Sequence, residues 1–234
     1  MKQPKIHLRI LREKPLAGLG RLGRHVEHDP RSRSFSAGTS AIVSVMHERH
    51  GPAFQQGDLG SCTGNAMAGA LMTEPLWKPG RKLVEKDAVA LYRLATTLDD
   101  IPGKYPPEDT GSSGLAVMKA AVKKKYITGY AHTFSLEQLL GSLVLRPGIL
   151  GVNWYDSFDA PRKDGECRLT AGARSRGGHE VQLFGIDAKK ERVWCYNSWG
   201  ATWGGRKNGT FWFSWKTLRR LLDEEGDATF PRTS

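Results

Sequence analysis

The sequence has no long apolar run, although 39% of its 234 residues are hydrophobic. Crossing a bilayer as a helix takes ~20 consecutive apolar residues, and no segment reaches that length. The first fifteen residues are basic, but they lack the apolar stretch of ~7–15 residues that a secretory signal carries. These absences predict a cytoplasmic protein without a membrane span, or one in the host cytoplasm if the source is viral.

Cysteine is scarce as well: the chain has only Cys62, Cys167 and Cys195. Three cysteines cannot build a disulfide framework, and an odd number without a signal predicts free thiols in a reducing compartment. The sequence also lacks Cys-x-x-Cys and His-x-x-x-His pairs, which are the usual ligand spacings of structural zinc sites. We therefore expect neither a metal nor another cofactor.

Negative charge is in deficit, with 24 Asp and Glu against 35 Lys and Arg, which gives a net charge of +11. Part of the excess is local, because residues 1–50 contain ten Lys and Arg but four Asp and Glu. Such a surface favours an acidic partner or a weak nucleic-acid contact. A basic run is more often a solvated surface, however, and no pattern indicates the oligomeric state.

The chain divides into a basic arm at residues 1–40, rich in Gly, Arg, Ser and Pro, and a domain at residues 41–234. We expect the arm to pack on the domain only in part. Apolar periodicity predicts helices over residues 63–76, 85–98, 115–125 and 136–145. Alternating and aromatic runs predict strands over residues 148–155, 179–186, 192–199 and 211–215. Helices followed by strands are typical of an α+β fold.

Two of these strands are close enough in sequence to form an antiparallel hairpin, because only five residues separate 186 from 192. If the turn centres on Ala188, Val181 faces Cys195 and His179 faces Asn197. Side chains alternate along a strand, so these odd-numbered residues share one face. The Asn197 carbonyl oxygen can then accept a proton from one imidazole nitrogen, which leaves the other nitrogen free to face a nucleophile.

Cys62 is the candidate nucleophile. It lies where a helix is predicted to begin, and the helix dipole and unpaired N–H groups there favour a thiolate. A nearby His179, as imidazolium, stabilises the thiolate further and activates the sulfur near neutral pH. The Cys62 backbone N–H and the Gln56 side-chain amide can together stabilise an oxyanion. A cysteine on its own is more often a small buried apolar residue.

Three separated stretches resemble the active-site motifs of the papain family of cysteine peptidases in their order and spacing. They are Gln56-Gly57-Asp58-Leu59-Gly60-Ser61-Cys62, then Gly178-His179-Glu180-Val181, then Asn197-Ser198-Trp199-Gly200-Ala201-Thr202-Trp203-Gly204. The resemblance runs from about residue 50 to 215. It implies a helical lobe over about 60–145 and an antiparallel sheet or barrel lobe over about 146–220, with a cleft between them. Without disulfides, the chain is similar to bacterial or phage members.

The resemblance also implies roles for individual residues. Cys62 is the nucleophile, His179 the base and acid, Asn197 the group that orients the imidazole, and Gln56 an oxyanion donor. Trp199 shields the hydrogen bond between His179 and Asn197 from water.

Further residues are expected to contact the substrate. The loop Gly111-Ser112-Ser113-Gly114 is similar to the family's glycine-containing wall, whose backbone pairs with the substrate chain. Gly178 and Trp199 complete the predicted substrate-binding set. Glu180 follows the histidine, where many relatives carry a small or apolar side chain, and its carboxylate either tunes the imidazole or is solvated.

The sequence therefore predicts a cysteine peptidase with a Cys-His-Asn triad that hydrolyses polypeptides through a thioester acyl-enzyme. One alternative keeps the chemistry but acts on other acyl or isopeptide bonds. The other alternative is a catalytically silent papain-like scaffold that binds a partner.

Overall fold

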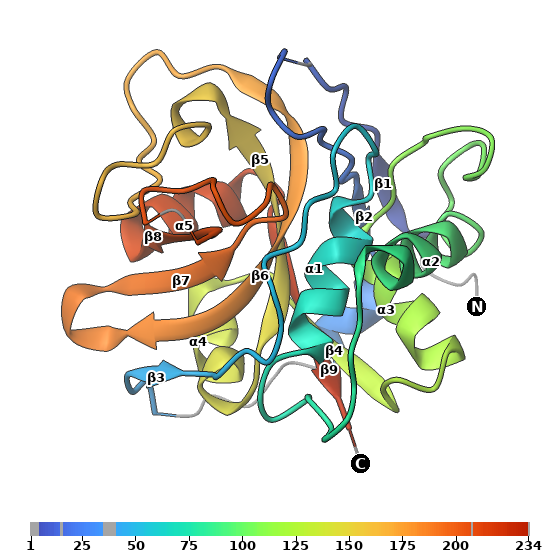
Figure 1. Ribbon diagram of the computed structural model, residues 1–234, viewed down its shortest axis with the longest axis horizontal. Helices are drawn as coiled ribbons and strands as arrows, with labels where there is room; N and C mark the ends of the chain where they lie inside the picture. The colour runs from blue at the N-terminus through green and yellow to red at the C-terminus, as the bar shows by residue number, and fades with distance from the viewer. Residues whose placement is uncertain (1–4, 15, 35–40, 207, 234) are drawn as a thin grey trace.

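A long antiparallel sheet separates the helices of residues 62–123, on one side, from those of residues 136–223, on the other (Figure 1). The structure is a computed structural model that describes residues 5–14, 16–34, 41–206 and 208–233. The arrangement confirms the predicted α+β class.

The helical part consists of α1 (Cys62–Leu71), α2 (Glu85–Ala95) and α3 (Gly114–Lys123). All of α1 is buried, because its small side chains let other elements approach closely. A Cβ atom on Gly64 would meet the Ala88 carbonyl oxygen and Tyr92 of α2. The helices predicted over 63–76, 85–98 and 115–125 are confirmed, with α1 ending five residues earlier than expected.

The sheet contains seven strands, in the order β4-β9-β5-β6-β7-β8, with β3 paired to β6. Neighbouring strands in the described part of the chain run antiparallel. Their bounds are β3 (Val45–Met46), β4 (Gly129–Thr133), β5 (Gly148–Tyr155), β6 (Ser175–Asp187), β7 (Arg192–Tyr196), β8 (Thr210–Ser214) and β9 (Asp227–Arg232). The four predicted strands are confirmed as β5 to β8, whereas β3, β4 and β9 were not predicted.

Two more helices, α4 (Leu136–Leu145) and α5 (Trp215–Asp223), pack against the face of the sheet opposite α1. Single 3₁₀ turns lie at Pro30–Ser34, Asp156–Phe158 and Ala188–Lys190. The Ser135 hydroxyl caps α4 by accepting from the Gln138 N–H, as its sequence predicts. The leucines of α4 belong to the apolar core of the sheet. β4 and α4, which lie within the range of about 60–145 expected for the helical lobe, thus pack with the sheet.

The predicted register of the β6–β7 hairpin is wrong by two residues. Leu183, rather than Val181, pairs with Cys195, because Asp187 pairs with Arg192 and the turn therefore centres between Lys189 and Lys190 instead of on Ala188. A bulge between Leu183 and Gly185 adds one residue to β6 and reduces the error from three residues at the turn to two at Cys195. A shift of two residues keeps the same side chains on each face, since their orientation repeats every second residue.

The basic arm packs more extensively than expected. Among its described residues, the strands β1 (His7–Arg9) and β2 (Val26–His28) pair antiparallel with each other. All the side chains from Arg24 to Asp29 are buried, and Leu22 contributes to the core of the sheet. The arm is thus an integral part of the folded molecule over residues 22–29.

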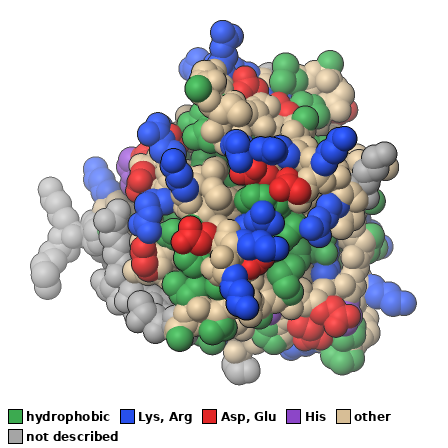
Figure 2. Space-filling model, turned by 90° about the vertical axis from the view of Figure 1, so that its left-hand side faces the viewer, with side chains coloured by type: hydrophobic (Ala, Val, Ile, Leu, Met, Phe, Trp, Pro, Cys, Tyr) green, Lys and Arg blue, Asp and Glu red, His purple; other side chains and the backbone are tan. Residues whose placement is uncertain are grey.

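Basic side chains lie among acidic and apolar ones on the face drawn in Figure 2. None of the described helices has the length and apolar character needed to cross a bilayer.

Candidate active site

Cys62 is the first residue of α1, and its side chain is completely buried. The turn before the helix contains Gly57 at φ +57°, a left-handed conformation that glycine adopts at little cost. This turn brings Gln56 back beside the start of α1, where its amide bonds the Leu59 carbonyl at 2.9 Å. The local sequence therefore presents the thiol at a helix N-terminus, as predicted.

His179 and Asn197 lie side by side, as the sequence predicts. The distance from His179 Nε2 to Asn197 Oδ1 is 2.7 Å. The same Oδ1 accepts from the Ser198 backbone N–H at 2.8 Å, so it is an acceptor and His179 Nε2 must carry the proton. His179 Nδ1 is then the unprotonated nitrogen, and it has no hydrogen-bond partner among the described residues. This is the tautomer that a general base needs.

Two tryptophans enclose the His179 ring. The Trp199 ring centroid lies 5.1 Å from that of His179, and the Trp154 centroid lies 4.9 Å away, edge to face. Trp199 is 4% exposed. Both indoles therefore cover the ring that bonds Asn197, and the shielding role expected of Trp199 stays a prediction.

The backbone of β6 brings the histidine to the cysteine. Helix α1 packs across β6, and the backbone N–H of Glu180, the residue after His179, interacts with the Cys62 thiol. The structure thus brings Cys62, His179 and Asn197 into one buried site from α1, β6 and the end of β7. Their catalytic roles stay predictions.

The N-terminal arm runs through this site. Gly178 accepts hydrogen bonds at its carbonyl from the N–H groups of Gly23 (3.2 Å) and Arg24 (3.0 Å). Ser112 donates to the Gly23 carbonyl at 2.8 Å and accepts from the His25 N–H at 2.8 Å. The predicted substrate contacts Ser112 and Gly178 therefore bind a polypeptide backbone, supplied by the chain itself.

The other predicted contacts border the same segment. A Cβ atom on Gly111 would collide with the Gly23 carbonyl, and one on Gly20 would collide with the Trp199 indole. Ser113 instead caps α3, and its hydroxyl also bonds the Glu27 carboxylate. The arm lies against Gly111 and Trp199, whereas the side chain of Ser113 holds α3 and β2.

Gln56 holds a carbonyl group of the arm. Its amide nitrogen donates to the Arg21 carbonyl at 2.9 Å, and its amide oxygen accepts from the Ser198 hydroxyl at 2.5 Å. The Arg21 and Leu59 carbonyls can only accept, so they fix which end of the amide is the donor. Gln56 is therefore oriented to donate to a peptide carbonyl in the cleft, which is the chemistry required of an oxyanion donor.

Burial beneath the arm opposes ionisation of the pair. It raises the pKa of the Cys62 thiol to about 12, with a further contribution from the Glu180 carboxylate. Burial also lowers the pKa of His179 to about 4, although the hydrogen bond to Asn197 acts in the opposite direction. The predicted thiolate at neutral pH is therefore not the favoured state while the arm is in place, because water is excluded from both groups.

Sequence reasoning missed a charged cluster next to the site. Arg24 is completely buried, and its guanidinium forms an ion pair with Asp227 of β9. Glu180 is 1% exposed, so the expectation that its carboxylate is solvated is wrong. Glu180 follows His179 on the same strand, so the two side chains point to opposite faces. No local pattern indicated the pair of Arg24 and Asp227, which are far apart in sequence.

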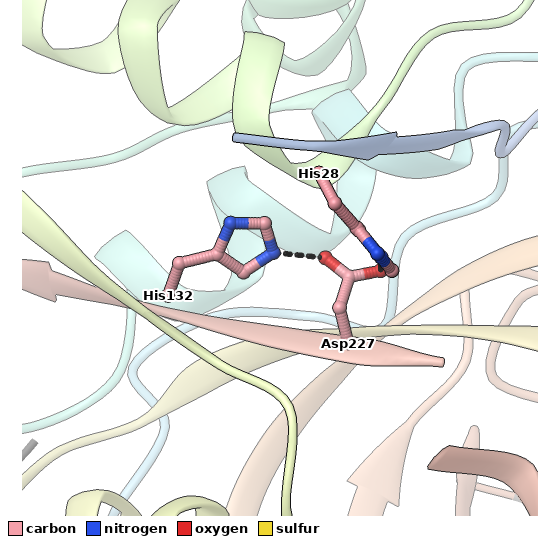
Figure 3. Close-up of side chains that lie close together, drawn as sticks. All are labelled: His28, His132 and Asp227. Atoms are coloured by element: carbon pink, nitrogen blue, oxygen red, sulfur yellow. Dashed lines mark hydrogen bonds and ion pairs between the residues drawn. The ribbon is translucent and has the colours of Figure 1, made fainter. Parts of the chain in front are cut away.

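His28, His132 and Asp227 meet on the other side of this cluster, and each offers one ligand atom within 4.8 Å of the others (Figure 3). Such a set can in principle hold a cation. Asp227, however, already binds the Arg24 guanidinium, and a second positive charge beside it is unfavourable. The donor set therefore suits an ion-pair network better than a metal.

Solved structures share this fold. Xylellain, a cysteine protease from Xylella fastidiosa, matches at a TM-score of 0.58 and 20% identity, over 94% of this chain and 100% of its own. Digestive procathepsin L 3 of Tenebrio molitor larval midgut matches at 0.62 and 14%, over 84% and 72%. The bromelain protease from Ananas comosus matches at 0.53 and 17%, over 78% and 94%. No family model and no curated protein matches the sequence. The matches confirm the papain-like two-lobe fold.

Proposed function

We propose that this papain-like chain is a cysteine peptidase whose N-terminal arm blocks its own active site. The observation that carries the proposal is the polypeptide backbone in the cleft. It is bound by Gly178 and Ser112 and held at one carbonyl by Gln56. A cleft with these hydrogen bonds accommodates a peptide, and Cys62 lies beside it.

The reaction follows from the geometry around His179. With its proton on Nε2, the ring accepts the thiol proton at Nδ1, and the Cys62 thiolate attacks a peptide carbonyl carbon. The carbonyl oxygen gains negative charge, which Gln56 and the Cys62 backbone N–H stabilise. The imidazolium then gives its proton to the leaving amine, and a thioester remains on Cys62. Water, deprotonated by His179, hydrolyses the thioester and restores the thiol.

The occupied cleft makes the described conformation latent. The backbone of Gly23 lies close to the Cys62 thiol, so the arm covers the nucleophile. Undocking of the arm would admit water. The pKa of the Cys62 thiol would then fall, and that of His179 would rise, toward their usual values. The arm bound to Gly178 and Ser112 also favours a peptide substrate over other acyl compounds.

The test compares the wild-type chain with Arg24→Ala, which removes the arm's buried charge without changing the triad. Each is incubated with a peptidyl epoxide at neutral pH, and the labelled cysteine is identified by mass spectrometry. We expect slow labelling of the wild type and fast labelling of Cys62 in Arg24→Ala. Cys167 and Cys195 are internal controls, since both are buried in the core of the sheet.

We expect the Arg24→Ala variant to hydrolyse a fluorogenic peptide amide. The double variant Arg24→Ala/Cys62→Ala should not. Exposure of Cys62 without faster labelling than Cys167 and Cys195 would contradict the proposal. The chain would then be a silent scaffold.

A further inference from the structure

Arg24 is the next residue of the arm after Gly23, which lies beside the Cys62 thiol. Its side chain fills a buried pocket. Its guanidinium Nη2 bonds an Asp227 carboxylate oxygen and donates to the Glu225 backbone carbonyl at 2.9 Å. Arg24 is 0% exposed. Burying an arginine is unfavourable unless its charge is paired and its N–H groups are bonded, so this pocket is built for a cation.

A second carboxylate faces the same side chain. A Cβ atom on Gly151 would meet both Arg24 Nε and Glu180 Oε2, which places these two groups together at the pocket wall. Neither Glu180 oxygen has a hydrogen-bond partner in the described part of the chain, and neither do Arg24 Nε and Nη1. Gly114 and Gly151 leave room for the acid, since a Cβ atom on either would crowd it.

The charges in the pocket are uneven. Burial and the neighbouring Asp227 charge raise the pKa of Glu180 well above its usual range. Burial acts on Asp227 in the same direction, but the Arg24 charge and the hydrogen bond from His132 hold its pKa well below its usual range. Asp227 is thus the fixed negative charge, whereas Glu180 beside it favours the protonated, uncharged form.

Two histidines hold Asp227 in position. His132 Nε2 lies 2.6 Å from Asp227 Oδ2, and His28 Nε2 lies 3.5 Å from Oδ1 (Figure 3). His132 belongs to β4 of the domain, whereas His28 belongs to the arm. The support from His132 therefore stays in place when the arm leaves.

We propose that this pocket selects substrates, so that the peptidase prefers a polypeptide with arginine, and next lysine, at the residue that occupies the place of Arg24. The inference rests on the proposed function. Arg24 enters the pocket because its backbone lies in the cleft, bridged to Ser112 and bonded to Gly178. A substrate chain bound by the same backbone groups would direct one side chain to the same place.

Arginine fits better than lysine because the acceptors are spread around the pocket. Asp227 and the Glu225 carbonyl lie near one end of the guanidinium, and Glu180 lies near Nε. A planar guanidinium presents five N–H donors, whereas an ammonium is a compact charge with three. A neutral side chain would leave Asp227 buried without a counter-charge.

The test uses three dipeptide epoxides that differ in one side chain: arginine, citrulline or leucine. Citrulline keeps the shape of arginine but has no charge. The full-length Arg24→Ala variant is labelled with each, and the rate of Cys62 modification is measured by mass spectrometry. We expect arginine to exceed citrulline at least about tenfold, because a charge-assisted hydrogen bond is roughly twice as strong as a neutral one.

Substitutions in the pocket sharpen the test through the ratio of the arginine rate to the citrulline rate. Adding Asp227→Asn removes the charge left unpaired by Arg24→Ala and should bring the ratio to about one. Glu180→Gln should lower it by less. Asp223→Asn makes the same change at an exposed residue of α5 and should leave the ratio unaltered. A ratio near one in Arg24→Ala, or faster labelling by the leucine epoxide, would overturn the inference.

Binding separates this inference from the proposed function. Fluorescence anisotropy measures the affinity of the full-length Arg24→Ala/Cys62→Ala variant for a labelled peptide of residues 19–28, with arginine or citrulline at position 24. If no epoxide modifies Cys62 but the arginine peptide binds at least tenfold more tightly, the catalytic proposal fails and the pocket stands. If both peptides bind equally, the pocket does not select arginine, whatever Cys62 does.

Discussion

Two histidines of this molecule, His179 and His132, are buried to 0% and 2% exposure, and each is bonded through Nε2 to one side-chain oxygen. The partner of His179 is the amide oxygen of Asn197 at 2.7 Å, and that of His132 is the carboxylate of Asp227 at 2.6 Å. In both rings, Nδ1 lacks a hydrogen-bond partner among the described residues. The geometry of the two pairs is nearly the same.

The two pairs differ in the charge of the residue that bonds the histidine. They also differ in the group that lies next to the pair. Asn197 is neutral, so the hydrogen-bond partner of His179 adds no charge to the ring, and a thiol lies nearby. Asp227 is charged and its other oxygen binds Arg24, so His132 supports an anion that attracts a cation. The pair of His179 and Asn197 is the one we propose to move protons, and the pair of His132 and Asp227 holds a buried charge.

The largest effect should come from breaking the first pair, which is His179 with Asn197. In the Arg24→Ala background, His179→Gln removes the base and should slow modification of Cys62 by peptidyl epoxide by on the order of 10³-fold. The reason is that the thiol then has no acceptor for its proton. The rate of adduct formation at neutral pH measures the effect.

The matched control is His47→Gln. His47 is a partly buried histidine whose Nε2 lies 2.7 Å from the Leu143 carbonyl oxygen, at the edge of the sheet. It should leave the labelling rate unaltered. Equal rates in the His179→Gln and His47→Gln variants would remove His179 from the reaction.

A smaller effect should come from removing the cation that the second pair, His132 with Asp227, holds. Arg24→Ala leaves Asp227 buried without its counter-charge while the arm is docked, and loss of one partner of a buried ion pair costs about 3 kcal/mol or more. The arm should therefore undock more often, and Cys62 labelling should rise about 100-fold over the wild type. Arg31→Ala removes an exposed arm arginine paired with Asp29 and serves as the control. Equal labelling of the wild type and Arg24→Ala would mean that this ion pair does not hold the arm.

The first pair could be predicted from the sequence, and the second could not. The spacing around Cys62, His179 and Asn197 carries local information about a helix start and a hairpin, and the residues of one strand face alternate regularly. Even a register error of two residues left His179 and Asn197 on the same face. By contrast, 203 positions separate Arg24 from Asp227, so no periodicity or spacing connects them.

The same distinction between local signals and distant contacts explains which elements of the fold could be predicted. Helix α4 and strand β5 were predicted with their observed bounds, because a Ser135 cap and a continuous apolar run are local signals. Strand β9 was missed because Asp227 and Pro231 are residues that strands disfavour. It exists through its pairing with β4 and β5. The arm was expected to pack on the domain only in part because it is basic and rich in Gly, Ser and Pro, although Arg24 pairs with Asp227 inside the domain.

The smallest effect concerns the free energy of unfolding. It comes from Asn197→Asp, which gives His179 a carboxylate partner like that of His132. Burial lowers the pKa of His179 from 6.5 in the unfolded chain to about 4 in the folded one. The folded state therefore stays neutral while the unfolded state takes up a proton, and stability is lost as the pH falls below 6.5. Between pH 7 and pH 5 this group should lower the free energy of unfolding by about 2 kcal/mol.

Asn197→Asp should reverse that contribution, because a carboxylate beside the ring favours the imidazolium. If the folded pKa of His179 rises above 6.5, the group adds stability as the pH falls instead of removing it. Urea unfolding at pH 7 and pH 5 measures both variants, and the other titrating groups, common to both, cancel in the difference. Equal losses in the wild type and Asn197→Asp would mean that the charge of the partner does not govern the buried ring, and that the two histidine pairs differ only in their neighbours.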